Sequence, residues 1–517
     1  MPSLRLPRAR GAARAAGPAP ARRTKTPLGR ITATLLVGTL AALGPILEGA
    51  LGDGRGWTIG LLLLLAAPSL ARAGGPRFHP LDPETYIPAT YFLSVAYSPV
   101  LRLLMSREFS LSSHETAAMR VAYAGAVGCA IACTALSRRQ ETPDTQRMVP
   151  MHRPKATLDQ DWATIIVGVL GLGLVATWIV TIGVGRFFSL NYASNHLEAD
   201  GKGLLLGGWH FIGVAVVYLL LRAASLRKAG LAVPRVISLA GLCFFASFLL
   251  NTVMGRRGPL VWLVLSIALA VHAYGIKIRR VWLAVGMVSI VFYGFFVEGA
   301  RAQQGKGIDA QISSASAYLD RIENPLEIGE LQRVYANLVT IVNEQPPIIS
   351  YPGESWVNAF LILVPKPLWS ERPLGLAQQY ALWTAPDLAR RGAGFAMGAA
   401  TEGYLNFGLA GTAIEIAVFS AFFFMLPLLV ASARGSPLLV RATAVNLASF
   451  AYNQFRGELT ALLKIAVSLG IALLAVLVLT SVVAHLRRGM AALGPTRKSS
   501  GRRQRDPRLG PSSALGR

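Results

Sequence analysis

The chain has 517 residues, of which 53% are hydrophobic and only 15% are charged, whereas a soluble globular protein carries roughly a quarter charged residues. Apolar runs of about 20 residues recur along it, which excludes a soluble fold and predicts an all-α polytopic membrane protein. The net charge of +25 collects in two tails and in short loops, and this pattern fits membrane orientation better than nucleic-acid binding.

The first part of the chain is predicted to be a tail followed by nine membrane spans. Residues 1–29 are basic and rich in Ala and Pro, which is typical of a disordered cytoplasmic tail. Residues 30–298 contain the spans, of which the second is short and the third is unusually polar. The nine spans are expected near residues 31–51, 57–72, 86–105, 116–137, 162–184, 204–222, 233–254, 258–276 and 280–298.

A long segment, residues 299–408, lacks a continuous apolar run of membrane length. Its part from Ala310 to Glu344 has helical periodicity. The ten-residue apolar piece from Ser355 to Val364 is too short to cross a bilayer, so it is an interfacial helix, a re-entrant helix or a buried segment of the loop. Three more spans follow within residues 409–486, near 409–431, 437–453 and 459–485. Residues 487–517 form a second basic, disordered cytoplasmic tail.

The distribution of Lys and Arg predicts the orientation of about twelve spans (eleven to thirteen). With the N-terminus inside, the inside segments hold 33 of the 51 basic residues. The positive-inside rule therefore places both termini in the cytoplasm and residues 299–408 on the outer face. The expected location is the bacterial inner membrane.

Motifs for other functions are absent or are better explained by structure. Cys129, Cys133 and Cys243 fall inside apolar runs, which indicates packing rather than disulfides or a zinc site. Asp159 and Asp161 are interpreted as acidic residues at the start of a helix. No P-loop or metal-binding motif is found, so neither a cofactor nor a metal is expected.

Two adjacent arginines, Arg256 and Arg257, fill a tight outer-face turn between two spans. Guanidinium groups match phosphate oxygens bidentately, and the helix that follows offers free N–H groups to an anion. The plainer alternative is that these side chains extend from the helix ends into water. Arg301 is a further phosphate or sugar contact, unless it only forms an ion pair with Glu298.

A second group of candidates lies between residues 366 and 456. Glu402 is the candidate base for an attacking sugar hydroxyl, and it shares a helix face with Asn406 if this segment is helical. Glu415 and Lys464 fall within spans, so each is expected to face the bundle interior or a partner. The candidate substrate-binding residues are Lys366, Trp369, Arg372, Arg390, Arg391, Tyr404, Asn406 and Arg456.

Three stretches together resemble the O-antigen polymerase family, the Wzy-type polymerases of oligosaccharide repeat units. The first is Gly255-Arg-Arg-Gly-Pro259 at the start of a span. The second is Val364-Pro-Lys-Pro-Leu-Trp369 with Arg372-Pro373 after it. The third is Glu402-Gly-Tyr-Leu-Asn-Phe-Gly-Leu-Ala-Gly411, similar to the family's E-x-Y-x-N-F-G-x-x-G run before a span.

The resemblance implies a metal-independent glycosyltransferase of the periplasmic face that polymerises undecaprenyl-diphosphate-linked repeat units into O-antigen, capsule or exopolysaccharide. Arg256, Arg257 and Arg301 would stabilise the leaving diphosphate. The implied partners are lipid-linked glycans, the bilayer, and a flippase and chain-length regulator of the same pathway, with no nucleic acid. The alternatives are an O-antigen ligase-like transferase and a polysaccharide or lipid transporter.

Overall fold

The fold is taken from a computed structural model of the chain. It describes residues 28–73, 79–105, 110–137, 158–189, 205, 207–228, 231–253, 258–273, 278–301, 308–320, 330–366, 368–390, 394–432 and 438–493. In these residues the secondary structure is helical, without strands.

The helices before the long segment are α1 (Leu28–Leu51), α2 (Arg55–Ala73), α3 (Pro83–Val95), α4 (Tyr97–Met105), α5 (Ser113–Ser137), α7 (Leu158–Ile182), α8 (Val184–Ser189), α11 (Gly208–Lys228), α12 (Pro234–Val253), α13 (Gly258–Ala273) and α14 (Arg280–Arg301). The long segment contains α15 (Ile308–Asp320), α16 (Glu330–Glu344), α17 (Glu354–Leu361), α18 (Leu376–Thr384) and α19 (Pro386–Arg390). The chain continues with α20 (Ala399–Ser432), α21 (Leu438–Ser449), α22 (Ala451–Phe455) and α23 (Leu459–Leu493).

Seven of the described helices are long and apolar enough to cross a membrane, and an eighth span exists if the bent pair α3–α4 counts as one. This confirms the membrane class. The predicted third span is the pair that bends, by 79° between Val95 and Tyr97. α13 is apolar but only 16 residues long.

The centre of the bundle is the packing of α5 against α20. A Cβ added at Gly128 of α5 would lie 2.0 Å from the carbonyl oxygen of Ala413, so only glycine allows the two backbones to approach this closely. Cys129 and Cys133 are fully buried beside this contact, and Cys243 is buried in a second cluster. All three cysteines are free, which confirms their role in packing.

Polar contacts join loops that the charge count assigns to the inner face. Asp161 at the start of α7 accepts a hydrogen bond from Tyr218 Oη (2.8 Å) and an ion pair from Arg222 (2.9 Å). Asp159 pairs with Arg487 at the end of α23 (2.7 Å). Both aspartates therefore serve the start of a helix and its neighbours, as predicted.

Segments that the charge count assigns to the outer face also contact one another. The Leu111 amide donates to the Asp53 carbonyl (3.0 Å), and Tyr335 of α16 donates to the Glu115 carbonyl (3.1 Å). Glu298 near the end of α14 lies 3.7 Å from Arg333 of α16. The long segment is thus attached to several helix ends on one side.

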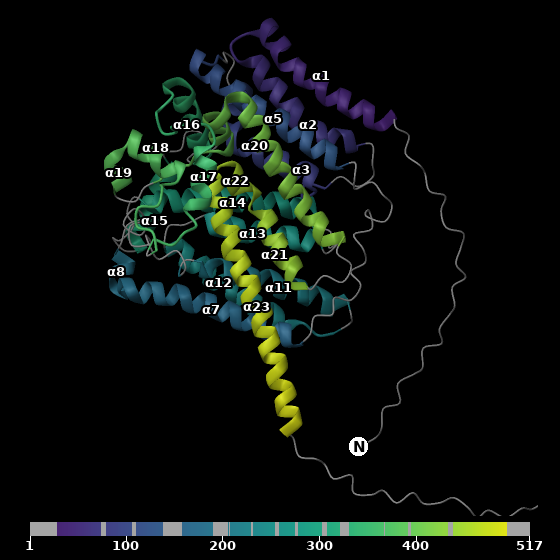
Figure 1. Ribbon diagram of the computed structural model, residues 1–517, viewed down its shortest axis with the longest axis vertical. Coiled ribbons are helices and arrows are strands. Elements are labelled where there is room, and N and C mark those ends of the chain that lie inside the picture. The colour runs from purple at the N-terminus through teal and green to yellow at the C-terminus, as the bar shows by residue number, and fades with distance from the viewer. Residues whose placement is uncertain are drawn as a thin grey trace, which may run out of the picture.

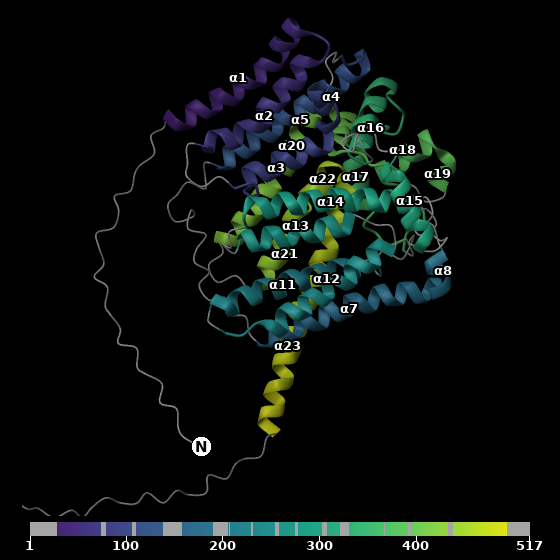
Figure 2. The same ribbon diagram turned by 180° about the vertical axis from the view of Figure 1, so that it is seen from behind.

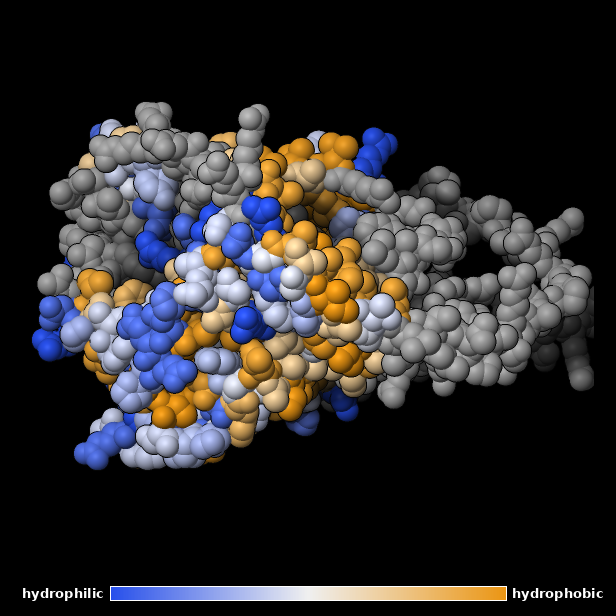
Figure 3. Space-filling view, turned by 90° about the horizontal axis from the view of Figure 1, so that it is seen from above, coloured by the Kyte–Doolittle hydropathy of each residue, from blue (hydrophilic) through white to orange (hydrophobic). Residues whose placement is uncertain are grey.

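Helices α15 to α19 gather at one side of the molecule, on the left in Figure 1 and on the right in Figure 2. Seen from above, hydrophobic residues cover broad areas of the surface, and hydrophilic residues gather toward the side where α16 and α18 lie (Figure 3). α23 crosses α7 and continues past the other helices (Figures 1 and 2). The long segment therefore covers one end of a bundle whose flanks are apolar.

Candidate functional site

α20 is broken near its start. Phe407 and Gly408 have non-helical backbone angles, and Gly408 has a φ of 65°, a conformation that favours glycine. A Cβ on Gly411 would lie 2.2 Å from the Gly403 carbonyl oxygen, so the two parts of the helix nearly touch across the break. The residues from Glu402 to Gly411 thus form a compact turn at the end of the span.

Glu402 sits fully buried in this turn. Its Oε1 accepts a hydrogen bond from Ser355 Oγ of α17 (2.7 Å), and its Oε2 accepts one from the amide of Leu459, the first residue of α23 (2.6 Å). One carboxyl group therefore joins the long segment to two spans.

Asn406 completes this junction from the next turn. Its Nδ2 donates to Ser355 Oγ (2.7 Å) and to the Glu402 carbonyl (3.0 Å), and its Oδ1 accepts from the Gly353 amide (3.0 Å). The side chains of Glu402 and Asn406 meet at the same serine, as their predicted common helix face requires.

Trp356 makes a third contact between α17 and α20. Its Nε1 donates to Glu415 Oε2 (3.0 Å), and its ring centroid lies 5.2 Å from that of Phe407. Glu415 is 3% exposed, which confirms that it faces the interior. The indole thus reaches past the break to a carboxyl group within the span.

Glu458 is the third buried carboxyl group here, directly before α23. It accepts a hydrogen bond from the Ala377 amide of α18 (2.8 Å). Burial raises the pKa of Glu458, while the backbone N–H donors and the charge of Lys464 act in the opposite direction. The Lys464 side chain is exposed and does not face the bundle interior, and its charge acts on Glu458.

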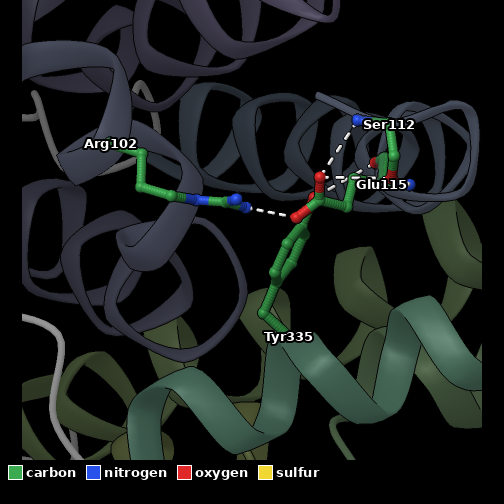
Figure 4. A network of polar contacts seen from close by, with 4 residues as sticks. All are labelled: Arg102, Ser112, Glu115 and Tyr335. Carbon is green, nitrogen blue, oxygen red and sulfur yellow. Dashed lines mark hydrogen bonds and ion pairs between the residues drawn. The ribbon is translucent and has the colours of Figure 1, made fainter. Parts of the chain in front are cut away.

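A separate network ties α16 to the bundle (Figure 4). Arg102 of α4 forms an ion pair with Glu115, which also accepts bonds from the amide (3.0 Å) and hydroxyl (3.2 Å) of Ser112. Tyr335 is buried beside Glu115, and this burial raises the pKa of its phenol. The network holds the α4–α5 connection against the long segment.

The structure describes only some of the basic residues that were predicted as site residues. Arg256, Arg257 and Arg391 lie outside the described residues, as does the side chain of Arg301, whose backbone ends α14. Arg390 is exposed and pairs with Asp387 (3.2 Å).

Other candidates lie closer to the junction of α17 with the spans. Arg372 donates from Nη1 to the carbonyls of Ile362 and Val364 after α17. Lys366 and Arg456 are half-buried and have partners, and Trp369 is 39% exposed. Tyr404 packs in two apolar clusters.

Sequence reasoning missed Ser355, Trp356 and Glu458. Ser355 and Trp356 donate hydrogen bonds to Glu402 and Glu415, and Glu458 accepts one from Ala377. These partners are distant in the sequence, and no local pattern indicates such a contact. The signal that was available is the polar serine that begins the apolar piece 355–364, because a buried hydroxyl needs a partner.

No group of three or more metal-ligating side chains is found in the described part of the chain. The chain matches no family model, no curated protein and no solved structure.

Proposed function

We propose that this protein is a membrane-embedded glycosyltransferase that joins undecaprenyl-diphosphate-linked oligosaccharide repeat units on the outer face of the bacterial inner membrane. In this proposal about twelve spans hold residues 299–408 outside and both termini in the cytoplasm. A flippase and a chain-length regulator are the expected partners, and the product is O-antigen, capsule or exopolysaccharide.

The observation that carries the proposal is the position of the Glu402–Gly411 run. The stretch that resembles the polymerases is where the long segment meets the spans, through the bonds from Glu402 and Asn406 to Ser355. A transferase of this kind needs a polar covering held over the membrane surface, where the diphosphate of a prenyl-linked sugar lies.

The reaction follows from the substrates. A hydroxyl of the acceptor sugar attacks the anomeric carbon of the donor glycan, the new glycosidic C–O bond forms, and the C–O bond to the diphosphate breaks. The hydroxyl proton passes to a base, and prenyl diphosphate leaves. Arg256, Arg257 and Arg301 are the groups proposed to stabilise its charge without a metal.

The contacts of Glu402 support a positioning role. Both of its oxygens accept hydrogen bonds and the side chain is buried, so it fixes α17 and α23 relative to each other. Its assignment as the base stays a prediction. Four of the other candidate residues, Lys366, Trp369, Arg372 and Tyr404, are proposed to contact the sugar or phosphate groups.

Reconstitution tests the proposal. The purified chain in liposomes, supplied with undecaprenyl-diphosphate-linked repeat units, is expected to produce a ladder of longer glycans by electrophoresis. Arg257→Ala is expected to abolish the ladder at an unchanged protein level. Arg257→Lys is expected to restore little of it, because the lysine ammonium lacks the planar pair of N–H donors with which a guanidinium binds phosphate. Arg279→Ala, in a loop assigned to the inner face, serves as the matched control and should leave the ladder unchanged.

The same assay separates the alternatives. Transfer of whole glycans to a different lipid acceptor without chain growth would identify a ligase-like enzyme. Movement of intact lipid-linked units across the liposome membrane without a new glycosidic bond would identify a transporter. A normal ladder from Arg257→Ala would remove this arginine from the proposed site.

A further inference from the structure

α17 has its polar and apolar faces in an unusual arrangement. Ser355, Asn358 and the small Ala359 are buried against the protein, whereas Val357 (48%), Phe360 (59%) and Leu361 (36%) are exposed. The exposed positions follow the spacing i, i+3, i+4 of one helix face. A helix that borders water buries its apolar face, so this arrangement matches an apolar surrounding.

The exposed face of α17 continues onto the apolar surface of a span. Phe407 is 47% exposed and packs on Trp356, and beyond it Ile414 and Val418 of α20 are 58% and 57% exposed. Because α20 is long and apolar enough to cross a membrane, its exposed flank faces acyl chains. The surface of α17 is an extension of that flank.

The depth of α17 follows from its contact with Glu415. This residue lies seven positions after Gly408, which corresponds to about 10 Å along a helix axis. Trp356 reaches it with a 3.0 Å hydrogen bond. The Trp356 indole therefore reaches the level of the first turns of α20 after the break, while Ser355 is bonded to Glu402 before it.

The backbone carbonyl groups after α17 have hydrogen-bond partners within the protein, as an apolar surrounding requires. Carbonyl groups after a helix end are unsatisfied unless a partner is supplied, and in lipid water cannot supply it. Arg372 donates to the carbonyls of Ile362 and Val364. Tyr351 (51% exposed) before the helix and Trp369 (39%) after it are residue types that favour the membrane–water boundary.

We infer that α17 and the residues that follow it up to Lys366 form a re-entrant element inserted in the outer leaflet, with Val357, Phe360 and Leu361 in contact with acyl chains. The inference concerns the membrane and does not depend on the proposed reaction. Of the three positions that the sequence leaves open for residues 355–364, it selects the re-entrant helix.

Spin labels on single introduced cysteines test the insertion. The native cysteines are buried, and the unmodified chain measures any labelling of them. Phe360→Cys and Val357→Cys are the test variants, Val418→Cys is the lipid-facing reference, and Gln378→Cys, on an exposed position of α18, is the aqueous reference. Collision rates with oxygen and with a water-soluble nickel chelate are measured in phospholipid nanodiscs.

Both test positions are expected to give an oxygen-to-nickel ratio close to that of Val418→Cys and several-fold above that of Gln378→Cys. A ratio equal to that of Gln378→Cys at both positions would place α17 in water and overturn the inference. Low rates with both reagents would show that protein covers this face, such as a second copy of the chain, and would overturn it equally.

Discussion

Helices α16 and α17 belong to the same long segment, residues 299–408, and are both amphipathic, but they are oriented in opposite senses. In α16 the apolar residues Val334, Leu338 and Ile341 are fully buried, and Gln332 is exposed. In α17 the buried face carries Ser355, and the exposed face carries Phe360. This difference indicates that α16 covers the bundle from the water side and that α17 borders lipid.

The largest expected effect tests the apolar side of α16. Val334→Asp places an unpaired carboxylate in a fully buried site, which is expected to cost about 4 kcal/mol of stability. Thermal unfolding of the purified protein in detergent measures it. Gln332→Asp, on the exposed face of the same helix, is the control and should change stability by less than about 0.5 kcal/mol. Equal effects from both variants would contradict the assigned orientation of α16.

The polar side of α17 is tested by a double-mutant cycle between Ser355→Ala and Glu402→Ala. Ser355→Ala alone is expected to cost about 2 kcal/mol because the hydrogen bonds to Glu402 and Asn406 are lost in a buried site. The coupling energy is expected to be about 1–2 kcal/mol. Additive effects would mean that the two residues do not act together. Ser370→Ala, at an exposed position, is the neutral control.

A smaller effect is expected at the end of α17. Arg372→Ala leaves the carbonyls of Ile362 and Val364 without this donor, at a cost of about 1 kcal/mol. Hydrogen exchange of the amides of residues 362–364 should become faster. Arg390→Ala, which removes an exposed ion pair, should leave this exchange unchanged. Unaltered protection in Arg372→Ala would show that the guanidinium does not stabilise α17.

The smallest expected effect is on the pH dependence of stability, through Glu458, which is bonded to Ala377 of α18. Burial raises the folded-state pKa of Glu458, so the folded protein binds the proton more tightly than the unfolded chain. The stabilisation is complete below the unfolded pKa and is lost as pH rises through the raised folded value. Glu458→Gln keeps an acceptor for Ala377 and removes this dependence.

Unfolding midpoints of both proteins from about pH 4 to about pH 8 measure this effect. The difference between the variant and the parent should grow in favour of Glu458→Gln as pH rises. A constant difference across the range would show that Glu458 is not perturbed by folding.

Much of the fold follows from the sequence because apolar length alone identifies a spanning helix. α5, α7, α11, α12 and α23 all begin within four residues of their predicted starts. The bend between α3 and α4 lies just before Pro99, which has no N–H to continue the helix of α3 and stands in the first turn of α4. Pro88, in contrast, lies inside α3 without ending it. The sequence predicts helical periodicity from Ala310 to Glu344, and the described residues of this range form the two helices α15 and α16.

The candidate site was predictable only in part. Glu402 and Asn406 share a local spacing, and their meeting follows from it. Ser355 and Leu459 come to Glu402 from sequence distances of 47 and 57 residues, and periodicity does not report such distances. The inverted faces of α17 were hidden for the same reason, because an amphipathic pattern does not say which side meets the protein.

The length of α23 has a consequence for the junction of α17 with the spans. The part of α23 from Leu459 to Leu486, before Arg487 and Arg488, comprises 28 residues and extends about 42 Å, whereas the hydrocarbon core of a bilayer is about 30 Å thick. Hydrophobic mismatch of this size makes the helix tilt, and the tilt changes with bilayer thickness. Because the first amide of α23 is bonded to Glu402, we expect a change in lipid chain length to shift Leu459 relative to this carboxyl group.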